Sequence, residues 1–116
     1  MDHRNLKLKS EVEASLADRK LYAVSLAVTG LIQFIIMSFE EHGIDKLHEM
    51  TDPSLDELTK VLEELSVEAK ELAERNINLE QAIHLAQTMV YDIKQKNPDL
   101  CANGARILKT VNVQLK

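Results

Sequence analysis

Residues 21–39 read LYAVSLAVTGLIQFIIMSF, and no charged side chain interrupts them. As a helix, this segment places Ser25, Thr29 and Gln33 on one face and leaves most of the remaining circumference apolar. Such a helix has to be enclosed by other helices of the same chain, by a second copy of the chain, or by lipid. The segment decides the fold, because every other part of the chain must be arranged around the way it is covered.

A membrane span is the main alternative for this segment, since about 20 apolar residues cross a bilayer. Gln33 in its middle and the lack of Trp at its ends weigh against a span. The later helices are amphipathic and need an apolar surface to pack on, and residues 21–39 offer the only large one. We therefore expect a buried helix, with a single-pass membrane anchor through residues 21–39 as the alternative.

The composition predicts one all-α domain. The 116 residues include only 3 Gly, 2 Pro and 3% aromatic residues, and Leu, Glu, Lys and Ala are frequent. The single Cys excludes an intramolecular disulfide and fits a reducing, cytoplasmic compartment. We expect a flexible tail over residues 1–9 and a single domain, a small helical bundle, over residues 10–116.

Charge is distributed unevenly along the chain. Residues 40–80 hold 13 acidic and 4 basic residues, a net charge of −9, whereas residues 1–39 carry +1 and residues 81–116 carry +3. The overall charge of −5 argues against direct binding to nucleic acid. The acidic middle is either a solvated helix face or a surface that attracts a basic partner.

Local signals predict the limits of the first helix. Ser10 and Glu13 form a capping box, and Gly43 suits the C′ position, so a helix over about residues 11–42 is expected. Gly30 costs about 1 kcal/mol inside a helix. Close packing of another helix at this bare position would explain that cost, and a kink at Gly30 is the alternative.

A short helical connector is expected over residues 44–50. The next helix has two possible starts. Pro53 suits the N1 position, whereas Ser54 and Glu57 form a second capping box in a slightly different register.

From residue 55 onward, apolar residues recur in alternating steps of three and four, which is a heptad seam. The seam predicts a helix or a pair of helices over residues 54–96. Eleven of its twelve positions are apolar, and the exception is Asn76. The twelve positions are Leu55, Leu58, Leu62, Leu65, Ala69, Leu72, Asn76, Leu79, Ile83, Ala86, Val90 and Ile93.

Asn76 in this seam has two explanations. It is a buried polar residue that fixes the register, or the helix breaks at residues 76–78. In the second case Asn78 caps a new helix, with Gln81 at N3. We favour the break.

A last helix is predicted after residue 96, with Asn97 as N-cap and Pro98 at N1. Gly104 weakens its first turns, so a start near Gly104 is a second possibility. A short strand over residues 111–115 is an alternative for the end of the chain.

The sequence contains no G-x-S-x-G, P-loop, dinucleotide, H-E-x-x-H or EF-hand motif. Asp45 with His48, and Glu80 with His84, each place a carboxylate and an imidazole on one helix face, but metal sites in bundles need such pairs from several helices. Cys101 is interpreted as a small core residue. We therefore expect no enzyme, no cofactor and no metal site.

The apolar segment and the seam together offer more apolar surface than one short chain readily encloses, so a homodimer is expected. Its interface is predicted on one part of the seam. The residues are Leu58, Leu62, Leu65, Leu72, Leu79 and Ile83.

The expected function is a non-enzymatic protein–protein interaction module. By analogy of type with small acidic helical antiactivators and inhibitors, it would cover the working surface of a partner, for example a basic DNA-binding regulator. A ligand- or metal-binding helical bundle is a further alternative. The predicted partner-binding residues are the acidic seam flanks Glu63, Glu64, Glu68 and Glu71.

Overall fold

The computed structural model describes the backbone of residues 3–72 and 76–115, and the side chains of residues 19–72 and 76–112. The described chain forms the helices α1 (His3–Glu49), α2 (Leu55–Glu71), α3 (Ile77–Lys94) and α4 (Pro98–Leu115). No strand occurs in these residues, so the prediction of a small all-α bundle is confirmed.

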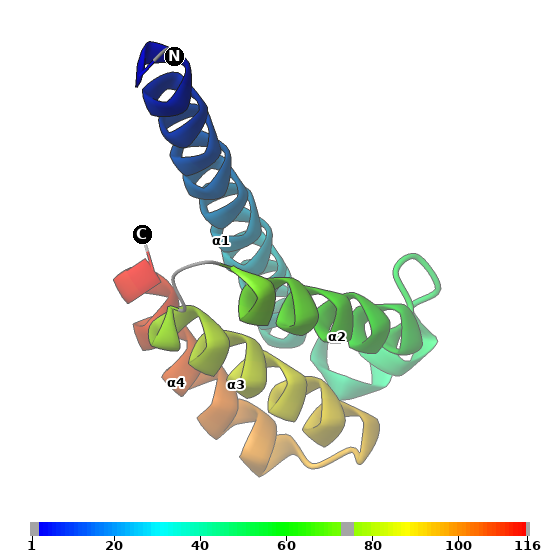
Figure 1. Ribbon diagram of the computed structural model, residues 1–116. Helices are drawn as coiled ribbons and strands as arrows, with labels where there is room; N and C mark the ends of the chain where they lie inside the picture. Colours follow the sequence, from blue (N-terminus) through cyan, green and yellow to red (C-terminus); the bar gives the residue numbers. More distant parts are fainter. Residues whose placement is uncertain (1–2, 73–75, 116) are drawn as a thin grey trace.

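Figure 1 shows how the helices are arranged. α3 lies between α2 and α4, and α1 contacts all three. The N-terminal part of α1 extends well beyond the bundle (Figure 1). The molecule measures 65 × 26 × 19 Å, with a radius of gyration of 17.4 Å, whereas a compact chain of this length has about 13 Å. The projecting part of α1 accounts for the difference.

The interior is built from the heptad seam and one face of α1. All eleven apolar seam positions are buried. The amphipathic helices α2, α3 and α4 cover one face of the apolar segment of α1, so the helix that was expected to be buried is buried on that face only. The buried residues of that face are Val24, Val28, Ile32, Ile35 and Ile36.

The predicted start of the first helix is wrong. α1 begins at His3, so Ser10 and Glu13 lie within the helix and do not cap its beginning. The residues before Ser10 include no Gly or Pro, and Leu, Lys and Arg among them are good helix formers, so the backbone has no local reason to start later. The division of the chain into a tail and one domain stays a prediction.

Gly43 interrupts α1, as its sequence position suggested. Its backbone angles, φ 78° and ψ 174°, lie in a region that essentially only Gly occupies. The chain bends there and returns to helical geometry up to Glu49. Leu47 is buried in this final segment and Ile44 packs against the core, so the connector expected over residues 44–50 is helical.

The kink considered at Gly30 is wrong, and the helix packing considered there does not come from this chain. Gly43 is the residue of α1 with non-helical angles, so there is no kink at Gly30. A Cβ atom built on Gly30 would have no neighbouring atom within 4 Å, so no other helix of the chain packs against this position.

The seam breaks where the sequence favoured a break, but the cap is a different residue. Asn76 has extended backbone angles, and its Oδ1 accepts a hydrogen bond from the Leu79 amide at 3.1 Å. Asn76 is therefore the N-cap of α3, and the prediction that Asn78 caps the helix is wrong. An Asn side chain can satisfy an amide at the open end of a helix, which explains why a polar residue stands at a seam position.

α4 begins as Asn97 and Pro98 predicted. The Leu100 amide donates to Asn97 Oδ1 at 3.3 Å, and Pro98 is the first helical residue. The alternative start near Gly104 and the alternative strand over residues 111–115 are both wrong, because α4 is helical from Pro98 to Leu115.

Two glycine variants test the bend in α1. Gly43→Ala should lower the free energy of unfolding by about 1–3 kcal/mol, because its backbone angles strain any residue with a Cβ. Gly104→Ala is the control, since its Cβ would lie 3.7 Å from Met89 Cγ, an ordinary contact within a helix. It should raise stability by about 0.4–1 kcal/mol. Urea denaturation followed by circular dichroism measures both, and equal effects of the two changes would contradict the strained bend.

Candidate protein-binding surface

The helix α2 has one buried and one exposed face. Leu58, Leu62 and Leu65 are among its buried residues, so the positions between them face water. The predicted partner-binding residues Glu63, Glu64, Glu68 and Glu71 are all exposed.

Three of these four carboxylates share one side of α2. Glu64, Glu68 and Glu71 follow the i, i+4, i+7 spacing that aligns side chains along a helix, and Glu57, seven residues before Glu64, extends the row. We call these four residues the acidic stripe. Glu63 lies about 100° around the helix from Glu64 and is not part of it.

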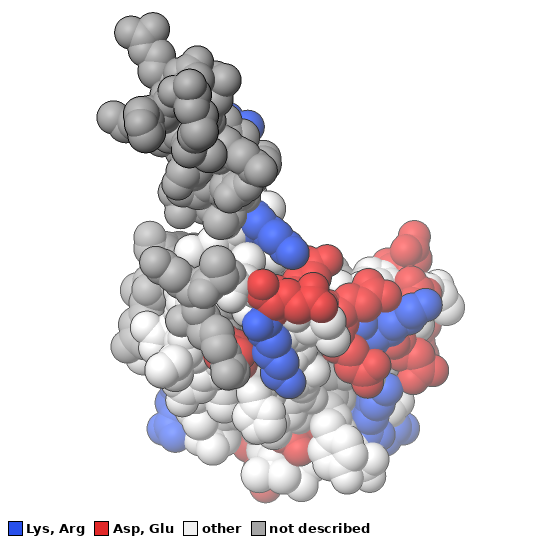
Figure 2. All heavy atoms as spheres, in the orientation of Figure 1, with Lys and Arg blue, Asp and Glu red and all other residues white. Residues whose placement is uncertain are grey.

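Among the residues that the structure describes, no ion pair involves any of the four carboxylates of the acidic stripe. Lys60 lies on the same side of α2 and reduces the charge of the face without cancelling it. Figure 2 shows the acidic side chains gathered over the part of the surface that α2 forms.

Two exposed valines flank the acidic stripe, and the sequence reasoning missed them. Val61 is 41% exposed and Val67 is 55% exposed. They lie three residues before and three residues after Glu64, so helical geometry places them on its two sides. The signal available in the sequence was their position outside the seam, where an ordinary water-facing helix carries polar residues.

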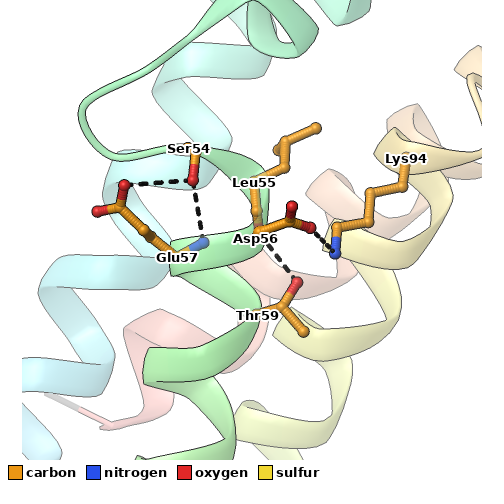
Figure 3. A network of polar contacts seen from close by, with 6 residues as sticks. All are labelled: Ser54, Leu55, Asp56, Glu57, Thr59 and Lys94. Atoms are coloured by element: carbon orange, nitrogen blue, oxygen red, sulfur yellow. Dashed lines mark hydrogen bonds and ion pairs between the residues drawn. The ribbon is translucent and has the colours of Figure 1, made fainter.

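The N-terminus of α2 is held by a cap, shown in Figure 3. Ser54 has extended backbone angles, and its Oγ accepts a hydrogen bond from the Glu57 amide at 3.1 Å. The same hydroxyl lies 3.3 Å from Glu57 Oε1, to which it donates. Of the two starts considered from the sequence, Ser54 is right and Pro53 at N1 is wrong, because α2 begins at Leu55.

Contacts from α3 fix the same end of α2 and the end of α1. Lys94 Nζ lies 3.0 Å from Asp56 Oδ1, so the last turn of α3 is joined to the first turn of α2 (Figure 3). His48 Nε2 lies 2.7 Å from the Ile93 carbonyl oxygen, which joins the end of α1 to the end of α3. The start of the helix that carries the acidic stripe is therefore held by its Ser54 cap and by Lys94 of α3.

The carboxylate–imidazole pairs do not assemble a site. His48 is engaged with Ile93, while Asp45 faces Lys96, whose Nζ lies 4.0 Å from Asp45 Oδ1. His84 is exposed on α3. In the part of the chain that the structure describes, no group of three or more His, Cys, Asp or Glu residues could hold a metal ion.

Cys101 is fully buried, as expected for a core residue. Burial, together with the carboxylate of Asp92, raises the pKa of its thiol to about 11. The thiol is therefore protonated at neutral pH, and the thiolate that nucleophilic chemistry requires is scarce.

An open hollow of about 510 Å³ lies beside the bend at Gly43. Its charged lining groups are Glu40, Asp45 and Lys96, and each has an ion-pair partner: Asp45 and Lys96 face each other, and Glu40 pairs with Lys109 of α4. The hollow therefore presents charges that already neutralise one another, and it indicates no particular ligand.

The six residues predicted for the dimer interface lie in the interior of one chain. Their exposed fractions range from 0% to 9%. Because α1, α3 and the rest of the bundle already cover them, a homodimer would have to use another surface. The residues are Leu58, Leu62, Leu65, Leu72, Leu79 and Ile83.

By length and composition, the segment Arg19–Glu49 of α1 could cross a membrane, with a mean hydropathy of 1.9. This hydropathy belongs to an 18-residue stretch of the segment, and only 28% of that stretch is buried within the chain. The buried part packs on α2, α3 and α4.

No protein-family model, no curated protein and no solved structure matches this chain. Function is therefore inferred from the surfaces of the molecule alone.

Removing the cap of α2 tests how the stripe is supported. Ser54→Ala should lower the free energy of unfolding by about 0.5–2 kcal/mol, because the Glu57 amide loses its partner. Asp56→Asn is the control, since it breaks only an exposed ion pair and should cost about 0–1 kcal/mol. Chemical denaturation measures both variants. If Ser54→Ala left stability unchanged, the cap would not hold the helix start.

Proposed function

We propose that this chain is a non-enzymatic protein–protein interaction module whose acidic stripe covers a basic surface of a partner protein. The observation that supports this proposal is the row of exposed carboxylates on α2 that form no ion pair among the described residues, with exposed apolar side chains beside them.

The two kinds of side chain contribute differently to binding. The stripe carboxylates attract a positively charged surface over a distance of about one Debye length, roughly 8–10 Å in physiological salt, and so accelerate association. Val61 and Val67 lose water only on contact, and so contribute to the lifetime of the complex. A polar rim around apolar residues is the ordinary composition of a protein interface.

A basic DNA-binding regulator in the cytoplasm is the partner class that fits best. A protein with a net charge of −5 is repelled by nucleic acid and attracted to the surface that would bind it. By occupying that surface, the chain would act as an antiactivator or inhibitor, without any chemical step.

A membrane anchor is the second candidate, because the apolar segment of α1 has the length and hydropathy of a span. The packing of Val28, Ile32 and Ile35 against the bundle supports the soluble alternative. A span would separate these residues from α2, α3 and α4, and would expose their seam to water. Sedimentation of the expressed protein with the membrane fraction would favour the anchor.

Neutralising the stripe tests the proposed function. Glu64→Gln with Glu68→Gln should leave the fold intact, since exposed charges contribute about 0–1 kcal/mol. Association with the partner recovered by affinity capture should slow roughly 3- to 10-fold at low salt, and the effect should shrink as salt rises. Surface plasmon resonance at several salt concentrations gives the association rates.

A matched control changes the same net charge elsewhere. Gln81→Lys with Thr88→Lys adds two positive charges to exposed positions of α3, away from the stripe. If this control slows association as much as the stripe variant, overall charge and not the stripe drives binding. If neither variant changes the rate at low salt, the acidic stripe is a solvated surface only.

A further inference from the structure

The side of α1 that faces away from the bundle is apolar. At about 100° per residue, it lies opposite the buried positions Val28, Ile32 and Ile35. Three large apolar side chains on it are exposed: 59% for Leu26, 48% for Met37 and 37% for Phe34. Met37 is therefore not a core residue. We call this side the outer α1 face; its residues are Ala23, Leu26, Ala27, Gly30, Phe34 and Met37, with Gln33 as the one polar member.

The outer α1 face has the spacing of a helix–helix contact. Ala23, Gly30 and Met37 are seven residues apart, and the positions between them hold Leu26 and Ala27 in the first interval and Gln33 and Phe34 in the second. This is a short heptad seam, separate from the one in the core, and it suits a partner that is itself a helix.

Charges at the two ends of this face indicate whether a partner helix would lie parallel or antiparallel to α1. Arg19 lies eleven residues before Gly30, and Glu41 lies eleven residues after it; both are exposed. Two parallel copies would place Arg19 beside Arg19 and Glu41 beside Glu41, which is repulsive. Two antiparallel copies would place each Arg19 beside the other copy's Glu41.

Side-chain sizes agree with the antiparallel arrangement. With Gly30 at the centre, Leu26 lies opposite Phe34 of the other copy, Ala27 lies opposite Gln33, and Ala23 lies opposite Met37. The last two pairs each set a small residue against a larger one. Gly30 meets Gly30, where nothing within 4 Å of the missing Cβ obstructs a close approach. Small residues at the crossing point allow two helices to approach closely.

We propose that α1 pairs with α1 of a second copy of this chain, antiparallel and with Gly30 on the two-fold axis. The contact runs from Arg19 to Glu41, about 33 Å of helix at 1.5 Å per residue. It covers the apolar surface that the fold leaves open, and the two bundles stay on opposite sides of the helix pair. An isologous contact of this kind closes on itself and stops at two chains.

Mass measurement tests the proposal first. Sedimentation equilibrium at roughly 0.1 mM, where an interface of micromolar affinity is saturated, should give twice the 13.1 kDa of one chain. Gly30→Leu should weaken the dimer roughly tenfold or more, because its side chain would separate the helices, while the chain's own fold has room for it. Thr88→Leu, at an exposed position of α3, is the control and should leave the dissociation constant unchanged.

A charge swap tests the orientation. Arg19→Glu and Glu41→Arg should each weaken the dimer roughly fivefold or more, because each removes two symmetric ion pairs and introduces repulsion. A chain that carries both changes should regain the dissociation constant of the original chain. If either residue acted only by supporting the fold, the second change would not restore the affinity.

Cross-linking tests the register independently. Leu26→Cys and Phe34→Cys chains should form a disulfide only when the two variants are mixed, because residue 26 lies opposite residue 34. Cys101 should not compete, since it is fully buried.

Three results would overturn the proposal. The first is a monomer at roughly 0.1 mM. If that monomer stays in solution when phosphatidylcholine vesicles are added, the outer α1 face is exposed to water. If it sediments with the vesicles, the face binds lipid. The second is a dimer whose dissociation constant is the same in Gly30→Leu and in the single variants Arg19→Glu and Glu41→Arg as in the original chain. The third is a disulfide in Leu26→Cys chains alone, which would show parallel helices.

Discussion

The fold depends on the apolar segment of α1 and on the single face of it that the chain can cover. Val28 and Ile32 are completely buried there, and each side chain of this size contributes about 1.5–3 kcal/mol when it leaves water. Because α2, α3 and α4 all contact α1, this face gives three amphipathic helices a common surface. Most of the stability of such amphipathic helices comes from packing their apolar face, so the packing against α1 decides whether they form.

The sequence predicted the class and the elements well because their signals are local. The heptad seam, the capping residues Ser54 and Asn97, and the special backbone of Gly43 all act within a few residues. Asn76 shows the limit of such reasoning. Asn76 and Asn78 both suit a cap, and the choice depends on where the seam must resume to bury Leu79.

The predicted dimer interface shows a different limit. A heptad seam indicates that one face of a helix is apolar, but it does not indicate whether the helix that covers this face belongs to the same chain. Leu62 and Leu79 are covered by their own chain, and the apolar surface that remains open lies on α1. Overall apolar content therefore suggested an interface without locating it. The acidic stripe was easier to find, since charged residues outside a seam face water in any arrangement of the helices.

The projecting N-terminal part of α1 also changes how the molecule moves through solvent. A chain with extents of 65 × 26 × 19 Å experiences more friction than a sphere of equal mass, and it tumbles anisotropically. On a size-exclusion column a single copy would elute early, with the Stokes radius of a heavier globular protein. Its elution volume would therefore resemble that of a compact dimer. Light scattering measures molar mass independently of shape, so it would distinguish an elongated monomer from a compact dimer.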